Sequence, residues 1–409
     1  MRILIIAPVA PYDGIPHAGG QYLATYSAGL RERGVDVEIV APEPVAPNRG
    51  PRGPDVVQVR LVPRAGARHP AALLWAAGRH AWRAIEPGLG VVRGFEENRQ
   101  FRELVASVDL IDIHWTEMLP LVPLLRRVAP RTPVFCTEYD VFTQHVRRAI
   151  HSPSPSQRAK AIVRYVHVSR REARLLNTVD RVYVFNRDNV GLLKGMGVTT
   201  TVATTDLFVP VVAERPPLER RRVIFAGAFG RAENREAARW LTERVWPTVR
   251  AQIPEGELYL VGDGPREWAT GLDGHSVHVT GRVPLLAPYY RDAGIACAPL
   301  QRGAGVKMKV LEGMAHGLPV VTTSVGAEGI VGDTHHPPPL VIADTPALFA
   351  DALIQLMQDQ PARVVLGRAG QRWVQGRYDS RRSITTIVTD MQEACGLATG
   401  TADEIRACR

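Results

Sequence analysis

The chain has 409 residues and a formal net charge of +9. This length exceeds the size at which one hydrophobic core keeps growing, so it predicts two domains. Hydrophobic residues make up 45% of the sequence and charged residues 22%, a balance typical of soluble globular proteins, and no apolar run reaches the roughly 18 residues that cross a bilayer. The apolar run at 3–6 is too short for a signal peptide. We therefore expect a cytoplasmic protein without a membrane-spanning segment.

The positive charge is unevenly distributed. Only four lysines occur and every other basic residue is arginine, so the close pair Lys307 and Lys309 is unexpected by chance. Residues 141–190 hold ten basic residues against three acidic ones. Such a surface suits anionic lipid headgroups, and we expect peripheral contact with the inner membrane face; the alternative is a solvated basic helix. No nucleic-acid-binding signature accompanies it, so we expect no nucleic acid partner. The residues proposed for this contact are Arg147, Arg148, Arg158, Lys160, Arg164, Arg170 and Arg171.

Cysteines and carboxylates give no metal signature. The four cysteines are Cys136, Cys297, Cys395 and Cys408. They form no C-x-x-C pair, so the sequence predicts neither a zinc site nor a disulfide framework. Cys136 and Cys297 lie inside apolar runs and are expected to be buried thiols. We interpret Asp109 and Asp112 as polar residues at the start of a strand, not as metal ligands.

Short apolar runs alternate with amphipathic segments along the chain. In the first half the predicted strands are 3–6, 37–40, 56–59, 110–113, 134–137 and 182–185. In the second half they are 223–226, 258–261, 277–280, 295–298, 320–322 and 340–342. This rhythm predicts an α/β protein with two parallel, doubly wound, Rossmann-like sheets.

A proline-containing segment separates the two series of strands. Pro210, Pro216 and Pro217 are typical of an interdomain linker. We expect an N-terminal Rossmann-like domain over 1–212 and a C-terminal one over 213–380. The remaining segment, 381–409, is expected to be a helix that packs back on the N-terminal domain and ends in a frayed tail.

The most informative segment is 303–319, in which a glycine-rich turn opens a helix. Backbone N–H groups of the turn and the positive end of the helix dipole suit a phosphate. Lys307 and Lys309 oppose that dipole unless a negative ligand is bound. At 100° per residue, Lys309, Glu312 and His316 share one face. The alternative is an ordinary amphipathic helix with a solvated Lys309–Glu312 pair.

Two further glycine pairs adjoin predicted strands. Gly19 and Gly20 precede a helix in the first half, and Gly227 and Gly230 follow the strand 223–226. Both pairs let a backbone approach a phosphate, so both domains are expected to present helix N-termini to a shared cleft; plain turn glycines are the alternative. Neither loop contains the G-x-G-x-x-G pattern, which argues against an NAD-dependent oxidoreductase.

His114 follows the strand 110–113, at the edge where open α/β sheets bind ligands. There it would orient an acceptor hydroxyl or a donor sugar. A core histidine that donates to a carbonyl is the alternative.

The motifs of the second half follow one another as in a known family. They are Phe225-Ala226-Gly227 with Asn234, then Trp240, Val245-Trp246-Pro247, Leu260-Val261-Gly262-Asp263-Gly264-Pro265, Gly281-Arg282-Val283, Ala298-Pro299-Leu300 and Leu311-Glu312-Gly313-Met314-Ala315. In the first half Gly19-Gly20 and Arg33-Gly34-Val35-Asp36-Val37 match the opening of that family. Over nearly its whole length the chain resembles the family 4 glycosyltransferases, retaining enzymes of the GT-B fold with two Rossmann-like domains facing a central cleft.

The resemblance implies transfer of a sugar from a nucleotide-sugar donor to an acceptor hydroxyl, with retention of configuration and without metal or cofactor. The domain over 1–212 would bind the acceptor, which is implied to be a glycan, a lipid-linked sugar or a small-molecule glycoside. The domain over 213–380 would bind the nucleotide sugar. Glu312 would accept hydrogen bonds from the ribose hydroxyls, and the backbone near Val283 would meet the base. Charge separately assigns Lys307 or Lys309 to the leaving diphosphate. The donor-binding residues would be Gly19, Gly20, Arg231, Asn234, Arg282, Val283, Gly303, Ala304, Gly305, Val306, Lys307, Lys309 and Glu312.

The candidate catalytic residues are His114 and Asp140, and no nucleophile or general base is assigned. Two positions depart from the family pattern. The family commonly has a glutamate eight residues before Glu312, where this chain has Ala304, and the frequent histidine of its Thr-x-His-Asp motif is Tyr139 here. An alternative is therefore a catalytically silent protein that binds a nucleotide sugar. The sequence specifies neither the donor, the acceptor nor the linkage.

Overall fold

The structure, a computed structural model, describes residues 1–11, 18–42, 56–59, 89–150, 155–209, 212–213, 221–272, 274–303, 305–330 and 336–397. Two compact units divide the chain. Unit 1 contains the residues from Gly19 to Thr205 with the first strand before them, and the chain returns to it from Ser380 onward. Unit 2 contains Asp206–Asp379. Among the described residues, no helix is both long and apolar enough to cross a membrane.

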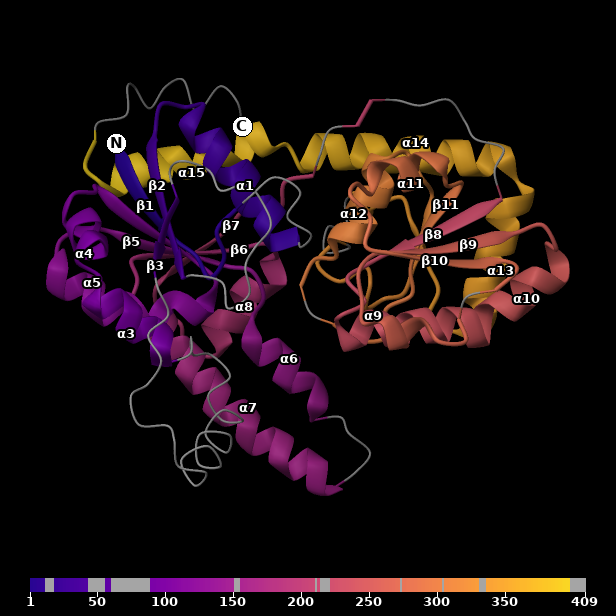
Figure 1. The fold of residues 1–409 in the computed structure, drawn as a ribbon, viewed down its shortest axis with the longest axis horizontal. Coiled ribbons are helices and arrows are strands. Elements are labelled where there is room, and N and C mark those ends of the chain that lie inside the picture. The colour runs from indigo at the N-terminus through magenta and orange to yellow at the C-terminus, as the bar shows by residue number, and fades with distance from the viewer. Residues whose placement is uncertain are drawn as a thin grey trace. The chain divides into compact units, whose positions relative to one another are not determined.

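Unit 1 is built on a parallel sheet with the order β3-β2-β1-β4-β5-β6-β7 (Figure 1). Its strands are β1 (Arg2–Ile6), β2 (Asp36–Pro42), β3 (Val56–Val59), β4 (Leu110–His114), β5 (Val134–Glu138), β6 (Arg181–Val184) and β7 (Thr201–Thr204). The central strand β1 is aliphatic after Arg2 because both of its faces are covered, and Ile3 to Ile6 have no exposed surface.

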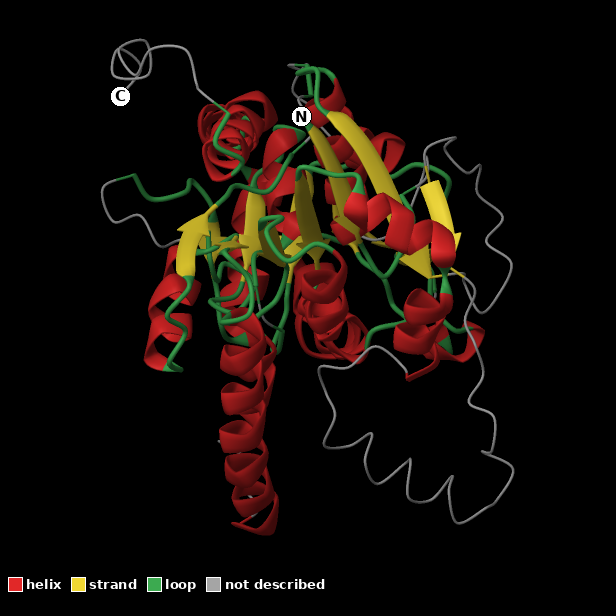
Figure 2. Cartoon of the chain, turned by 90° about the vertical axis from the view of Figure 1, so that its left-hand side faces the viewer, coloured by secondary structure: helices red, strands yellow, loops and turns green. Residues whose placement is uncertain are grey.

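Helices cover both faces of this sheet (Figure 2). They are α1 (Ala18–Arg31), α3 (Leu89–Glu97), α4 (Arg99–Ala106), α5 (Val122–Val128), α6 (Phe142–Ala149), α7 (Pro155–Leu176), α8 (Arg187–Gly195) and α15 (Ser380–Ala394), with a 3₁₀ segment η1 (Thr116–Leu121) after β4. Side chains cap several of them. Asn98 accepts from the backbone N–H of Phe101 at the start of α4, and Asn186 accepts from that of Asp188 at the start of α8.

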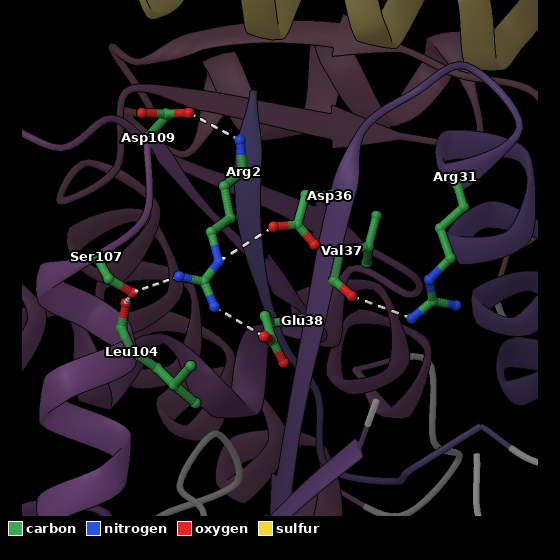
Figure 3. A network of polar contacts seen from close by, with 8 residues as sticks. All are labelled: Arg2, Arg31, Asp36, Val37, Glu38, Leu104, Ser107 and Asp109. Atoms are coloured by element: carbon green, nitrogen blue, oxygen red, sulfur yellow. Dashed lines mark hydrogen bonds and ion pairs between the residues drawn. The ribbon is translucent and has the colours of Figure 1, made fainter. Parts of the chain in front are cut away.

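Arg2 joins the beginnings of three strands of unit 1 (Figure 3). Its backbone N–H donates to Asp109 Oδ2 over 2.7 Å, just before β4. Its guanidinium donates to Glu38 Oε1 of β2 over 2.8 Å and lies 3.3 Å from Asp36 Oδ2. These contacts link the amino ends of β1, β2 and β4. They do not involve the carboxyl ends of the strands.

Unit 2 has a second parallel sheet with the order β10-β9-β8-β11-β12-β13. Its strands are β8 (Arg222–Ala226), β9 (Glu257–Val261), β10 (Val277–Gly281), β11 (Ile295–Ala298), β12 (Val320–Thr322) and β13 (Val341–Ile342). Its helices are α9 (Ala232–Trp240), α10 (Trp246–Gln252), α11 (Ala287–Asp292), α12 (Met308–Ala315), α13 (Pro346–Gln358) and α14 (Gln360–Arg377), with a π segment η2 (Leu241–Val245) and a 3₁₀ segment η3 (Arg266–Ala269).

The predicted α/β class with two doubly wound sheets is confirmed. All twelve predicted strands are present, and β7 was not predicted. Cys136 and Cys297 are buried thiols, as expected. The interpretation of Asp112 is wrong: it lies inside β4 with no exposed surface, not at the start of the strand.

In both sheets the strand order reverses beside the first strand, between β1 and β4 in unit 1 and between β8 and β11 in unit 2. Open α/β sheets bind ligands at the carboxyl ends of strands at such a point. The fold therefore directs attention to the residues that follow β4 and those that follow β8 and β11.

Candidate functional site

The carboxyl end of β8 meets the first turns of α9 and α12 in unit 2. Gly227 directly follows β8 and has Asn234 of α9 and Lys309 of α12 against it. A Cβ atom at Gly227 would lie 3.2 Å from Lys309 Nζ and 3.3 Å from Asn234 Cγ. Glycine at this position therefore lets the two polar side chains converge at the switch point.

Asn234 and Lys309 form a fixed polar pair. Asn234 is buried, and its Nδ2 donates to the carbonyl of Ala228 over 2.8 Å, which turns Oδ1 toward α12. Lys309 Nζ donates to that Oδ1 over 2.6 Å and lies 4.9 Å from the ring centre of Phe225. One of the three ammonium protons is used by Asn234, so the lysine is oriented while keeping donors for a ligand.

The protonation state of Lys309 would respond to a bound anion. Burial and, to a lesser extent, the nearby charge of Lys307 together lower the pKa of Lys309 to about 7, while the charge of Glu312 opposes them. An anionic group that arrives here would favour the ammonium form, since opposite charges raise the pKa of a lysine. The arrangement matches the binding of a diphosphate better than that of a neutral ligand.

Glu312 lies one turn further along α12 and is paired with a buried tyrosine. Tyr290 of α11 donates its hydroxyl to Glu312 Oε2 over 3.1 Å, and its ring stacks on His316 with centroids 4.8 Å apart. Among the described residues Glu312 Oε1 has no hydrogen-bond partner. Burial raises the pKa of Glu312 to about 7, and the hydrogen bond from Tyr290 and the charge of Lys309 hold it down.

The glycine-rich turn leads into α12 as expected. Gly303 and Gly305 have φ of 138° and 71°, in the region that favours glycine, and Lys307 is the N-cap of the helix. Lys307 is buried and its Nζ donates to the Gly305 carbonyl over 2.5 Å, with Glu328 3.9 Å away. Its charge therefore lies over the turn itself. Ala304 lies outside the described residues, and Val306 is half-buried.

The remaining predicted donor residues of unit 2 lie at the same edge of its sheet. Arg231 is exposed and is the N-cap residue of α9, whose first turn contains Asn234. Arg282 and Val283 follow β10, where Gly281 turns the chain with φ of 66°. Arg282 is exposed and Val283 half-buried.

In unit 1 the predicted glycines lie in the first turn of α1. Gly20 is buried, and Gly19 packs against two aromatic rings. A Cβ at Gly19 would lie 2.6 Å from Trp115 Cζ2 and 3.2 Å from Tyr139 Cε1. The need for glycine at position 19 has therefore a packing explanation that the sequence did not show.

His114 is buried, with both ring nitrogens bonded. Its Nε2 lies 3.1 Å from Asp112 Oδ2 and its Nδ1 2.9 Å from the hydroxyl of Tyr139. Because a carboxylate only accepts, Nε2 carries the proton and Nδ1 accepts from Tyr139. Asp112 Oδ2 also accepts from the hydroxyl of Tyr26 over 2.6 Å. Because both ring nitrogens are already bonded, His114 would act on a substrate only through the hydroxyl of Tyr139.

Asp140 is half-buried and follows Tyr139 at the end of β5. It is close enough to Glu117 to add to the rise in the pKa of that carboxyl, which burial mainly causes. Behind it, burial raises the pKa of Glu138 well above its usual range, and the charge of Glu172 of α7 adds to this rise. Within the described residues, no group of three or more histidine, cysteine or acidic side chains could hold a metal ion.

Two family models match the chain in succession. Residues 18–205 match the glycosyl transferase 4-like domain, and residues 220–359 match glycosyl transferases group 1. The chain belongs to the family 4-like glycosyltransferases. This confirms the resemblance seen in the motifs, and the matched ranges include the sheet of unit 2 and every strand of the unit 1 sheet except β1.

Relatives and solved structures agree with this family. The chain is 32% identical over 173 residues to a phosphatidyl-myo-inositol mannosyltransferase of Mycolicibacterium smegmatis, which covers 40% of this chain and 42% of that protein. The match covers about half, or less than half, of the length of these curated relatives.

Among solved structures, sucrose-phosphate synthase from Thermosynechococcus elongatus has a TM-score of 0.68 at 17% identity, covering 97% of this chain and 100% of that one. HepE from Anabaena, in complex with UDP and glucose, has a TM-score of 0.62 at 13% identity, covering 96% and 100%. At these identities the likeness concerns the fold, and the GT-B fold class is confirmed.

Proposed function

We propose that this family 4-like glycosyltransferase moves a sugar from a nucleotide-sugar donor to an acceptor hydroxyl, with retention of anomeric configuration. The observation that carries the proposal is the convergence of Lys309, Asn234 and Glu312 at the switch point of unit 2. A cation held by an amide beside a carboxylate suits a nucleoside diphosphate, which presents phosphates and ribose hydroxyls. HepE, a structural neighbour, is known in complex with UDP and glucose.

Each group has a separate role in this proposal. Lys309 and the N–H groups before α12 would stabilise the diphosphate, which gains negative charge as the bond to the sugar breaks. Glu312 would accept hydrogen bonds from the ribose through Oε1. Arg231 would add positive charge at the start of α9, and Arg282 with Val283 would border the base.

The test is a donor screen with matched variants. UDP-, GDP-, dTDP- and ADP-sugars are compared for thermal stabilisation, because a ligand at 100 times its dissociation constant adds about 2.7 kcal/mol to stability. The stabilising donor is then used for transfer and hydrolysis assays with the wild type, Lys309→Ala and the exposed control Lys194→Ala. We expect the Lys309 variant to lose both stabilisation and turnover and the control to keep them. Stabilisation by none of the four donors would contradict the proposal.

Two finer statements are read from the same assays. Binding without transfer or hydrolysis, across a broad acceptor panel, would favour the catalytically silent alternative. The configuration of the product, read by NMR before it can anomerise, tests retention. The positive groups at the site are expected to stabilise the charge of the leaving diphosphate, so transfer should persist in excess EDTA. Loss of transfer in EDTA that is reversed by magnesium or manganese would reject metal-independent transfer.

We also propose that unit 1 contacts an anionic membrane surface through α7. The α6–α7 hairpin extends away from the sheet of unit 1 (Figures 1 and 2). Three aliphatic side chains of α7 are exposed, Ile162, Val163 and Val166, at 45%, 55% and 39%. At 100° per residue they occupy one arc of the helix, a pattern typical of interfacial helices that carry basic residues beside an apolar face. The exposed basic residues of α7 are Arg158, Lys160, Arg164, Arg170 and Arg174.

Vesicle co-sedimentation separates the membrane proposal from a solvated basic helix. Binding to phosphatidylglycerol-containing vesicles is expected, falling with salt, since surface charges are screened beyond about 8 Å at physiological ionic strength. Val163→Glu should weaken this binding, whereas Glu243→Gln in unit 2 should not. Absence of binding at low salt would reject the membrane contact and leave a soluble acceptor.

A further inference from the structure

A groove of about 490 Å³ lies in unit 1 between the α6–α7 hairpin and helix α8 (Figure 1). Volumes of about 300–1,000 Å³ are typical of sites that bind small molecules. Helix α8 connects the parallel strands β6 and β7, so it runs in the opposite direction to them. Its second half, from Gly191 onward, lines the groove. The groove therefore lies away from the carboxyl ends of the strands.

The walls of the groove are apolar. They include Ile150 at the end of α6, Tyr165 of α7, and Leu192 and Met196 of α8 and its C-terminal end. All four are half-buried, so part of each side chain remains accessible. Ile162 precedes Tyr165 by one turn on the same side of α7 and is 45% exposed. The apolar surface of the groove therefore continues onto the exposed aliphatic residues of α7.

Two glycines of α8 leave open space in the groove. Gly191 and Gly195 are one turn apart and both line it. A Cβ atom built on either glycine would have no atom within 4 Å. Neither has the positive φ that favours glycine, and glycine lowers the stability of a helix. The backbone of α8 therefore does not explain these two glycines, whereas the space above them does.

The charge at the groove is positive. Arg147 of α6 lines the groove, is exposed, and forms no ion pair with another residue in the part of the chain that the structure describes. The described residues that line the groove include no acidic side chain. Lys194, between the two glycines in sequence, is also exposed. Apolar walls beside an uncompensated cation match a ligand with an alkyl chain and an anionic head.

We propose that this groove binds one alkyl chain of an anionic membrane lipid, with the phosphate of that lipid at Arg147. This rests on the proposed contact of unit 1 with an anionic membrane, and adds a specific site for a single lipid. The guanidinium donates to the phosphate oxygens, and the chain lies along Leu192 and Met196 over the two glycines. Each methylene group that the groove buries strengthens the attachment of unit 1 to the membrane.

Methyl NMR of the full chain, labelled at the methionine methyl groups, tests the groove in the absence of a membrane. The probe is decyl phosphate below its critical micelle concentration, compared with butyl phosphate and decyltrimethylammonium. We expect decyl phosphate to shift the Met196 signal saturably, while the signal of Met357, buried in unit 2, stays unchanged.

The two comparison probes separate the chain from the charge. Because burial of two methylene groups already corresponds to about tenfold in affinity, butyl phosphate should bind at least about tenfold more weakly. Decyltrimethylammonium has the longer chain but is repelled by Arg147, so it should also bind more weakly. An unshifted Met196 signal with decyl phosphate, or equal binding of the two decyl probes, would overturn the proposal.

Variants that fill the groove provide the matched test. Gly191→Leu and Gly195→Leu place a side chain in open space and favour the helix, so both are expected to fold. Each should weaken binding of decyl phosphate at least about tenfold. Gly376→Leu in α14 of unit 2 is the control, because its Cβ also has no atom within 4 Å, and it should bind like the wild type. Wild-type affinity in both filled variants would contradict the site.

Vesicle co-sedimentation of the same variants separates this site from the membrane contact on which it rests. Both filled variants should bind phosphatidylglycerol-containing vesicles more weakly than Gly376→Leu does. Undiminished vesicle binding in the filled variants would reject the lipid site and leave the contact through α7. Decyl phosphate binding without any vesicle binding would reject a membrane lipid as the occupant, together with the contact. A dimer in sedimentation velocity that Gly195→Leu dissociates would show instead that a second copy of the chain occupies the groove.

Discussion

At the scale of single residues, the proposed donor site depends on two hydrogen bonds that fix charged side chains. Tyr290 holds Glu312 through Oε2, and Asn234 holds Lys309 through Oδ1. In each pair a buried neutral group orients a half-buried ionisable one. Oriented groups bind a ligand with less loss of side-chain freedom, which is the general advantage of preorganised sites.

Glu312 makes donor binding sensitive to pH. The carboxylate is the stronger acceptor for ribose hydroxyls, and its pKa of about 7 means that donor affinity should fall as pH decreases through that value. The bond from Tyr290 lowers the pKa of Glu312, so Tyr290→Phe should move the midpoint to higher pH. Glu312→Gln should weaken binding by about 1.5–3 kcal/mol and remove this pH dependence.

Isothermal titration with the donor found in the screen, across a pH series, measures this effect. Tyr289→Phe alters the neighbouring tyrosine and serves as the control for Tyr290→Phe. An unchanged midpoint in Tyr290→Phe, with the protein folded, would show that Tyr290 does not act through Glu312.

Lys309 links donor binding to proton uptake. Near neutral pH its ammonium is only partly protonated, because burial lowers its pKa to about 7. A diphosphate beside it favours the charged form, so binding should take up a fraction of a proton. Glu312 releases protons on binding in the opposite sense, because its pKa is also about 7, so the titrations use the Glu312→Gln background. Titrations of that variant in two buffers of different ionisation enthalpy measure the uptake, and adding Lys309→Arg should abolish it, since arginine stays charged. Equal apparent enthalpies in both buffers for Glu312→Gln would contradict the role of Lys309.

The sequence predicted part of this site at residue level. The 100° spacing placed Lys309, Glu312 and His316 on one face, and all three are half-buried while Leu311 and Ala315 are buried. Tyr290 was not singled out, because its hydroxyl meets a carboxylate 22 residues away and a tyrosine in a short helix is indistinguishable from a core residue. Asp112 was misread for the same reason: its partner Tyr26 is 86 residues away.

At the scale of elements, the α6–α7 hairpin is held at its base by a buried carboxyl group that lies near the end of β5. Glu172 of α7 accepts from the backbone N–H groups of Phe142 and Thr143 at the start of α6, over 2.6 and 2.9 Å. Glu138 of β5 is close enough for the charge of Glu172 to add to the rise in the pKa of Glu138, which burial mainly causes. The two carboxyl groups therefore interact electrostatically between the strand end and the hairpin.

This pair should make unit 1 less stable as pH rises. Burial raises the pKa of Glu138 above its usual range, so the folded state binds more protons than the unfolded state. Its contribution is complete below the ordinary glutamate pKa and is lost as pH rises toward the elevated one, by up to about 1.4 kcal/mol per pH unit. Glu138→Gln removes the ionisable group and should flatten the decline above the ordinary glutamate pKa.

Urea unfolding at several pH values, followed by signals from unit 1, checks the slope. Glu393→Gln on the exposed side of α15 is the matched control and should retain the wild-type slope. Equal slopes for Glu138→Gln and the wild type would show that Glu138 does not hold an extra proton in the folded state.

The strands show where sequence patterns are sufficient. Strands buried on both faces are rich in aliphatic residues, such as β1 and β4, and these were predicted within a residue or two at each end. β7 pairs only with β6, and its residues Thr201–Thr204 are half-buried or exposed. An edge strand of this kind needs no apolar run, so its residues carry no period that distinguishes them from a loop.

At the scale of the whole molecule, the chain leaves unit 1 after Thr205, builds unit 2 and returns. Helix α15 then packs in unit 1. Arg33 of the turn after α1 donates to the carbonyl of Arg381 over 2.7 Å, and Ile384 fills the space over Gly29, where a Cβ would lie 2.3 Å from its Cδ1. Asp390 accepts from Tyr183 over 2.6 Å and pairs with Arg181 at 2.5 Å, both in β6. The C-terminal segment is therefore a structural part of unit 1, although it follows unit 2 in sequence.

The attachment of α15 should be separable from donor binding. Asp390→Asn weakens a charge-assisted contact with β6 and should cost about 1.5–3 kcal/mol, because hydrogen bonds to charged groups are the stronger ones and this carboxylate is only 20% exposed. Hydrogen exchange should then quicken in α15 and β6, while the stabilisation of unit 2 by the donor stays at the wild-type value, since Lys309, Asn234 and Glu312, the residues proposed to hold the donor, belong to unit 2. Asp351→Asn, exposed on α13, is the control that should change neither. Faster exchange confined to unit 2, or lost donor stabilisation in Asp390→Asn, would show that α15 acts on the donor site and not only on unit 1.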